Sequence, residues 1–343
     1  MTVGTVASWS RPEVGRVVRQ AQLRDLANID RLYRQGVRAH ASEAGPPGSG
    51  PVGLWFLATQ TLAAILPTLY PETSLHVLEG PLGRLGGFVQ AGARNTGPLT
   101  GVTSWQVLNL CVDDSQRDAD AVADLLDQLS NQALARGVVN LFVRLPDRDP
   151  MLPAFRMQGF RQYATEQVFY TEQPELSEVS TPPGGLRPVK RKDAALIYNL
   201  YRRVTPLGVA LVEAPSIKTW RSQYPVIPER RAPREASEKQ TVIDRSEMLA
   251  WSRWKPSSAT RPHTISITTV PDQELADQLV DWALAVIGPA CGPVWSSVRH
   301  YDSHMMQALR SHGFGILTTQ CLLVRQLAKR EPVHKKAWVP QFG

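Results

Sequence analysis

The sequence predicts an α+β protein built from two copies of one domain, each a mixed β-sheet flanked by helices. The first observation is a long repeat: segment 154–170, AFRMQGFRQYATEQVFY, aligns without gaps with segment 308–324, ALRSHGFGILTTQCLLV. The second is a matching start, because Arg19 and the LRDLANIDRLY that follows resemble Arg187 and RKDAALIYNLY. A repeat of this length indicates two domains rather than a solenoid of short units.

Composition places the boundaries of these domains. The segment 171–186, TEQPELSEVSTPPGGL, is rich in Pro, Ser and Glu and is typical of a linker. The N-terminal domain is therefore expected over 1–170, the C-terminal domain over 187–328, and a basic tail over 329–343. A chain of 343 residues is long enough for two cores that pack against each other.

In the first copy, apolar periodicity predicts a strand over 17–22 and a helix over 23–37. A hairpin over 74–80 and 85–93 turns at Gly80-Pro81 and precedes a strand over 104–112. A helix over 119–136 ends before Gly137. The copy closes with a strand over 138–145, a short helix over 151–158 and a strand over 163–170.

The second copy repeats this order. A short strand over 185–190 leads to a helix over 193–204, and strands follow over 240–245, 248–254 and 263–270. A helix over 274–288, a strand over 294–301, a short helix over 303–312 and a strand over 315–326 complete it. The elements therefore alternate as in a mixed sheet with helices on its faces.

Composition also narrows the classes of function. The 3 cysteines are odd in number and never at C-x-x-C spacing, which predicts a reducing, cytoplasmic location and no structural zinc; no metal site is expected. The net charge of +7 lies entirely in 171–343, in scattered clusters without a nucleic-acid-binding motif, so nucleic acid is not an expected partner. The uncharged stretch 44–71 is broken by Gly53 and Pro67, so we expect a packed helix there and no membrane contact.

The element order and the Gly-Phe that ends each short helix resemble the GNAT acetyltransferase superfamily, in tandem. The resemblance spans nearly the whole chain. It implies two GNAT-like domains, each a twisted mixed β-sheet that is splayed between its fourth and fifth strands. It also implies acetyl-CoA in that opening as acyl donor, and a small amine or a peptide amine as acceptor.

The resemblance assigns the cofactor site to the turn after the strand 104–112. The family's pattern there is [Q/R]-x-x-G-x-[G/A], and the sequence offers Arg117, or the alternative register Gln116-x-x-Ala119-x-Ala121. Asp120 and Val122 replace small residues in the first register, and the acids could equally be an ordinary helix start. The implied cofactor residues are Leu110, Cys111, Val112, Gln116, Arg117, Asp118, Ala119, Asp120, Ala121 and Val122. The second copy lacks the motif, and no CoA is expected there.

The catalytic residues are less well marked. The family's tyrosine, four residues before the Gly-Phe glycine, is replaced by Phe155 and Leu309, neither of which can donate a proton. Direct attack of an amine on the thioester would then need a general base. The candidates are Glu166 and Tyr163 on the strand 163–170, and Glu79 on the strand 74–80.

Two functions follow from the sequence and stay open. In one, the N-terminal domain transfers an acetyl group from acetyl-CoA to an amine, and the C-terminal domain is a degenerate partner that shapes the acceptor cleft. In the other, the protein is a catalytically silent binding or scaffolding protein of the same fold. The preserved spacing around Arg117 favours the enzyme, whereas Phe155 and Leu309 favour the silent protein.

Overall fold

The structure of the chain is a computed structural model. It describes residues 16–41, 73–80, 84–94, 104–113, 119–172, 174, 182–226, 238–255, 262–288 and 292–327. The segment 44–71, residues 175–181 of the expected linker and the tail 329–343 lie outside this part of the chain.

The strands form one 12-stranded sheet in the order β1-β2-β3-β4-β5-β12-β6-β11-β10-β9-β8-β7. Only β4–β5 and β10–β11 are parallel among the described strand pairs. The first half supplies β1 (Val17–Gln20), β2 (Thr73–Glu79), β3 (Leu85–Ala93), β4 (Ser104–Val112), β5 (Asn140–Pro146) and β6 (Arg161–Thr171). The second half supplies β7 (Leu186–Pro188), β8 (Lys239–Asp244), β9 (Met248–Lys255), β10 (His263–Thr269), β11 (Val294–Arg299) and β12 (Gly315–Gln326).

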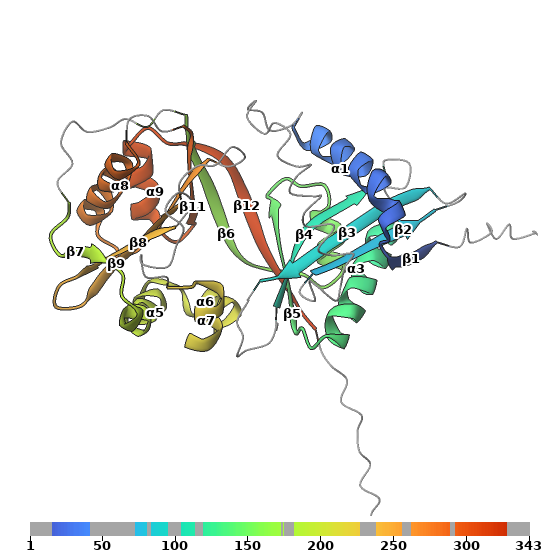
Figure 1. The fold of residues 1–343 in the computed structure, drawn as a ribbon, viewed down its shortest axis with the longest axis horizontal. Coiled ribbons are helices and arrows are strands. Elements are labelled where there is room, and N and C mark those ends of the chain that lie inside the picture. Colours follow the sequence, from blue (N-terminus) through green and yellow to red (C-terminus); the bar gives the residue numbers. More distant parts are fainter. Residues whose placement is uncertain are drawn as a thin grey trace, which may run out of the picture.

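The two halves exchange their last strands. β12 pairs with β5 of the first half on one side and with β6 on the other, and β6 in turn pairs with β11 of the second half. Figure 1 shows β6 and β12 running side by side between the two sets of helices. The repeated segments that end the two copies therefore lie next to each other at the centre of the molecule.

The helices cover both faces of the sheet (Figure 1). In the first half, α1 (Leu26–Ala41) packs on β2 and β3 from one face, whereas α3 (Ala119–Ala135) and α4 (Leu152–Met157) cover the other. In the second half, α5 (Ala194–Val204), α6 (Leu207–Glu213) and α7 (Ile217–Gln223) lie across the sheet from α8 (Gln273–Ile287) and α9 (Ser303–Ser311).

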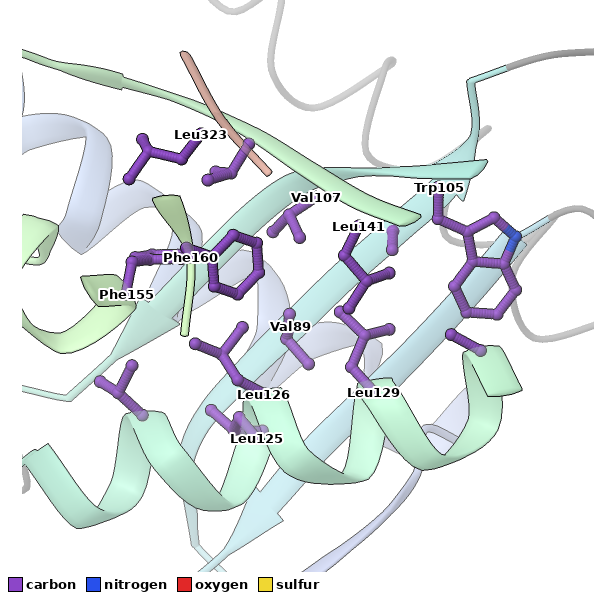
Figure 2. Close-up of a cluster of buried hydrophobic side chains, with 14 of the residues drawn as sticks. Val89, Trp105, Val107, Leu125, Leu126, Leu129, Leu141, Phe155, Phe160 and Leu323 are labelled. Carbon is purple, nitrogen blue, oxygen red and sulfur yellow. The ribbon is translucent and has the colours of Figure 1, made fainter. Parts of the chain in front are cut away.

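Each exchanged strand completes the other half's core. Leu323 and Cys321 of β12 are buried against α3, α4 and β5, and Figure 2 shows Leu323 above Phe160 and Leu126. Reciprocally, Phe169 of β6 is buried among residues of α8, α9 and β11. Because burying a large apolar side chain contributes about 1.5–3 kcal/mol, the exchange ties the stability of the two halves together.

The repeated arginine near the start of each copy forms the same structure twice. Arg19 donates from both terminal nitrogens to Asp25, at 2.7 and 3.0 Å, and Arg187 does so to Asp193, at 2.7 and 3.1 Å. Such bidentate pairs combine charge with fixed geometry. They fix the entry into α1 and α5, which explains why this part of the repeat is readable in the sequence.

The predicted fold class, two tandem copies of a mixed sheet with helices, is confirmed. The sequence did not predict that the sheets would join and exchange strands, nor the short helices α6 and α7 between 204 and 224. Among the described helices, none has both the length and the apolar character needed to cross a membrane.

Candidate functional site

The opening between the fourth and fifth strands, which the family resemblance predicts, is present between β4 and β5. These strands pair only over Ser104–Gln106 and Asn140–Phe142, although β4 continues to Val112 and β5 to Pro146. The end of β4 stays with β3 instead, where Gly87 pairs with Val112. A Cβ on Gly87 would lie 2.8 Å from the Cys111 carbonyl oxygen, so the glycine permits this close approach. The backbone of Leu110–Val112 therefore borders the opening.

The structure describes the start of α3 only in part. Gln116, Arg117 and Asp118 lie outside the described residues, as does the side chain of Ala119. Ala121 and Val122 are buried in the core with Leu125, whereas Asp120 is exposed. Ala121 is therefore a core residue, whereas the carboxylate of Asp120 faces the solvent.

The position of the family's tyrosine is apolar in both halves. Phe155 is 1% exposed and packs edge-on against Phe160, with ring centroids 5.1 Å apart. Leu309 is fully buried beside Phe314 in the other half. Gly159 and Gly313 turn the chain after these residues with φ of 80° and 79°. In both halves the glycine of the Gly-Phe pair forms the turn and the phenylalanine packs in the core. The position four residues before the glycine holds no proton donor in either half.

Two of the three predicted catalytic residues lie together near the centre of the sheet. Tyr163 has no partner residue on β12, because Leu322 pairs with Ala164 and Leu323 with Gln162. Such a bulge changes which face the following side chains point to. Tyr163 donates a hydrogen bond to Glu213 at the end of α6 (3.1 Å), and Glu166 is 3% exposed nearby.

A buried charge network connects these residues. Arg299 of β11 donates to Glu213 at 2.6 Å and lies 3.3 Å from Glu166. Burial alone would lower the pKa of Arg299, but the Glu213 and Glu166 carboxylates raise it well above its ordinary value. Arg144 of β5 also contacts Glu166 (3.4 Å), and Arg94 after β3 contacts Glu213 (3.7 Å). The network therefore joins both halves of the molecule.

The tyrosines around this network stay neutral. Burial raises the pKa of Tyr163 to about 12, with a further contribution from Glu213. Burial likewise raises the pKa of Tyr201 on α5 and of Tyr301 after β11. Each can act as a hydrogen-bond donor at neutral pH, and none is a base there.

The network borders a cavity of about 260 Å³ where β10 and β11 separate, lined mainly by the second half together with Arg144 and Glu166 of the first. These strands pair only over His263–Ile265 and Val294–Ser296, as β4 and β5 do in the first half. The walls combine charged groups with aromatic and aliphatic side chains, among them Trp220, Tyr224, Trp251, Val204, Ile265 and Ile267.

Asp302, at the start of α9, also lines this cavity. Among the described residues, its carboxylate has no hydrogen-bond or ion-pair partner. Burial raises its pKa to about 7, which the charge of Arg299 only partly offsets. Asp302 is thus the unpaired carboxyl of the cavity.

Glu79, the third predicted catalytic residue, lies elsewhere. Glu79 is on β2, where it accepts a hydrogen bond from Arg19 of β1 (2.6 Å). Four strands of the sheet separate β2 from β6. Sequence reasoning missed Glu213, Arg299, Arg94 and Asp302. One signal was available: Val143-Arg144 and Asp147 recur as Val298-Arg299 and Asp302, and both arginines contact Glu166.

No protein-family model and no curated protein matches the sequence. Among solved structures, the chain is similar to a GCN5-related N-acetyltransferase from Sphaerobacter thermophilus, with a TM-score of 0.61 and 15% identity over 93% of this chain and 97% of that one. A tandem GNAT protein from the clavulanic acid biosynthesis pathway has a TM-score of 0.48 and 16% identity over 92% and 100%. Saccharomyces cerevisiae N-myristoyltransferase has a TM-score of 0.49 and 10% identity over 90% and 82%.

The first of these similarities spans almost the full length of both chains, and it agrees with the separated parallel strands and the Gly-Phe turns of each half. The chain therefore has the fold of the GNAT N-acetyltransferases, present twice and joined by exchanged strands.

Proposed function

We propose that the protein is an N-acyltransferase that takes an acetyl group from acetyl-CoA at the β4–β5 opening and transfers it to an amine. The single observation that carries this proposal is the separation of β4 and β5 beyond Gln106 and Phe142, with α3 beginning just beyond the end of β4. Helix N-termini favour anions through their free N–H groups and dipole. The fold of the similar Sphaerobacter protein, whose name is that of an N-acetyltransferase, supports acyl transfer in general.

The residues at the β4–β5 opening fit acetyl-CoA in part. The backbone of Leu110–Val112 would polarise the carbonyl, and Gln116–Val122 would hold the diphosphate. Asp113 is paired with Arg31 at 3.6 Å, which reduces its repulsion of phosphate, but Asp120 is exposed. When bound, acetyl-CoA would supply a thioester that an amine can attack. Glu166 is held between two guanidiniums, so its role in this proposal is to fix Arg299 and Arg144 beside the acceptor.

The second candidate, a silent binding protein of the same fold, is favoured by the burial of Phe155 and Leu309 where a proton donor would stand. The two candidates differ in one property, because only the enzyme needs a competent donor site. General acid–base help is typically worth about 10²–10⁴-fold in rate, so its absence weakens transfer without excluding it.

Calorimetric titration with acetyl-CoA tests the proposal. We expect saturable binding, and we expect Asp120→Ala to tighten it about three- to tenfold, because one negative charge near the diphosphate is removed. Asp127→Ala is the matched control: it removes an acid of the same helix about 10 Å further along and should change affinity little. No binding at millimolar acetyl-CoA would leave the silent protein as the better description. Binding without acetylation of any amine in a screen would also favour it.

A further inference from the structure

The outer faces of α5, α6 and α7 form a surface that the proposed acyl transfer does not use. These helices lie across the sheet from α8 and α9 (Figure 1). Their inner faces meet around Tyr201 of α5, which donates to Glu213 of α6 (3.4 Å) and has its ring centroid 6.4 Å from that of Trp220 of α7. Because these three side chains are buried, the opposite side of each helix is the exposed one.

Three leucines are exposed on these outer faces. Leu207 and Leu211 of α6 are 62% and 52% exposed, and Leu196 of α5 is 45% exposed. Leu207 and Leu211 are one helical turn apart, so their side chains are neighbours. A single exposed leucine is common, whereas neighbouring exposed leucines among polar residues are typical of a binding surface.

The exposed charged residues of the same three helices are all basic. Arg202 of α5 and Lys218 and Arg221 of α7 are exposed, and none of them has an ion pair among the described residues. Over residues 194–226 the only acid is Glu213, which is buried. The leucines are therefore surrounded by uncompensated positive charge.

The opposite layer of the second half has the reverse charge. The helix α8 carries Glu274, Asp277 and Asp281 and contains no Lys or Arg. Charge that is separated in this way orients a molecule as it approaches a charged partner. A negative partner would therefore meet the side of α5, α6 and α7 rather than the side of α8.

An anionic lipid surface matches both the charges and the leucines. Lys and Arg are attracted to anionic headgroups, and apolar side chains enter the boundary between headgroups and acyl chains. Nucleic acid would pair with the bases through its phosphates and would leave the leucines in water. A protein interface usually has exposed aromatic residues at its centre, whereas Tyr201 and Trp220 are buried beneath this surface.

From these observations we infer that the outer face of α5, α6 and α7 binds reversibly to an anionic lipid bilayer. This α5–α7 surface consists of three leucines and three bases, Leu196, Arg202, Leu207, Leu211, Lys218 and Arg221. The contact lies in the plane of the bilayer and does not involve the stretch 44–71, for which the sequence predicts no membrane contact. The inference goes beyond the proposed acyl transfer, because it requires neither acetyl-CoA nor the β4–β5 opening.

The test is sedimentation of the full chain with lipid vesicles, without acetyl-CoA. At a salt concentration of about 0.1 M we expect binding to vesicles of equal parts phosphatidylcholine and phosphatidylglycerol, and about tenfold or more weaker binding to phosphatidylcholine alone. At about 1 M salt, where charges are screened beyond about 3 Å, binding to the mixed vesicles should weaken strongly. Equal binding to both vesicles, or none to the mixed ones, would overturn the inference. Binding to an oligonucleotide but not to vesicles would assign the surface to nucleic acid and overturn it as well.

A charge-reversal pair tests the bases of the surface. Lys218→Glu combined with Arg221→Glu should weaken binding to the mixed vesicles about tenfold or more. The matched control is Arg156→Glu combined with Arg161→Glu, because these exposed arginines of the first half change the net charge equally. The control should change binding about twofold or less, since its charges lie away from the contact. An equal loss in both pairs would show that only the net charge matters, which contradicts a defined surface.

A second pair tests the leucines. Leu207→Gln combined with Leu211→Gln should also weaken binding about tenfold or more, because two apolar side chains no longer enter the bilayer. Met157→Gln in the first half, where Met157 is 69% exposed, is the control and should leave binding unchanged. Unaltered binding of the leucine pair would show attraction by charge alone and would overturn insertion into the bilayer. If this pair fails to fold, the charge-reversal pair and the comparison of vesicles still decide the outcome.

Discussion

At the scale of single residues, the charged groups near the centre of the sheet divide into paired and unpaired. Arg299 is ion-paired with both Glu213 and Glu166, so removing one partner would leave a buried charge behind. Asp302 has no such partner, and its cost to the folded state depends on pH. The repeat in the sequence marked Asp302 and Asp147 as equivalent, but the structure distinguishes them, because Asp302 is half-buried in the cavity wall and Asp147 is exposed.

This difference gives a prediction for stability. Because the pKa of Asp302 is about 7 in the folded chain against 3.8 as the ordinary value, the folded state binds more protons between these values and loses stability as pH rises through them. Asp302→Asn should therefore gain stability relative to the unaltered chain as pH rises from about 4 to about 7, by up to about 4 kcal/mol over this whole interval. Urea unfolding at several pH values measures it. With Asp281→Asn as control, parallel curves for Asp302→Asn and the unaltered chain would contradict the prediction.

A second titrating group acts in the opposite direction. Burial lowers the pKa of His76 on β2 to about 4, with Arg136 contributing. A histidine with a lowered folded pKa stabilises the fold above about pH 6.5, and that contribution is lost as pH falls toward 4. His76→Gln should therefore make unfolding less sensitive to acid in this window, which urea denaturation at pH 4.5 and 7.5 can measure. An unchanged acid sensitivity would show that His76 is not neutral in the folded chain.

At the scale of elements, the strands and long helices were predictable, whereas the pieces that build the cavity were not. Alternation and turn residues revealed most strands of the sheet, and apolar periodicity revealed α3 and α8. In contrast, α6 and α7 are each 7 residues long, too short for periodicity to separate from a loop. The bulge at Tyr163 leaves no mark in the sequence, since any residue can occupy it. Residues of α6 and α7, Glu213 and Trp220, line the cavity.

The Gly-Phe turns give a prediction at this scale. Gly159 and Gly313 have φ of 80° and 79°, a region that disfavours side chains by about 1–2 kcal/mol. Gly159→Ala and Gly313→Ala should each destabilise the chain by roughly this amount in urea unfolding. Gly208→Ala is the matched control, because this glycine lies in α6 with open space around it and alanine favours helix by about 1 kcal/mol. A neutral effect at both 159 and 313 would mean that other backbone conformations satisfy these turns.

At the scale of the whole molecule, the exchange of β6 and β12 makes the two copies one folding unit. The repeat showed that there are two copies, but it could not show which copy each last strand completes. Residues 154–170 and 308–324 are so alike that either strand has the pattern to pair with β5 or β11. Only the packing of Leu323 in one core and Phe169 in the other distinguishes the two arrangements.

Unfolding of the full chain should therefore occur in one transition. In differential scanning calorimetry, we expect the van't Hoff enthalpy to equal the calorimetric enthalpy. Residues 1–172 and 182–343, expressed separately, should each lack stable structure, and together they should form a one-to-one complex. Two resolved transitions, or a first half that folds alone, would contradict the cooperative unit inferred from the strand order.

The exchange also means that the central strands cannot pair fully until the end of the chain has been synthesised. Roughly 140 residues separate the end of β6 from the start of β12. At a synthesis rate of about 5–20 residues per second, β12 therefore begins to emerge about 7–30 s after β6 is complete. During that interval β5 and β6 both lack the neighbour that separates them in the finished sheet, and unpaired strand edges invite other chains. Substitutions in β12 should then show their effect first in the yield of native protein from cells, and in its need for chaperones, before any defect is seen in the molecules that complete folding.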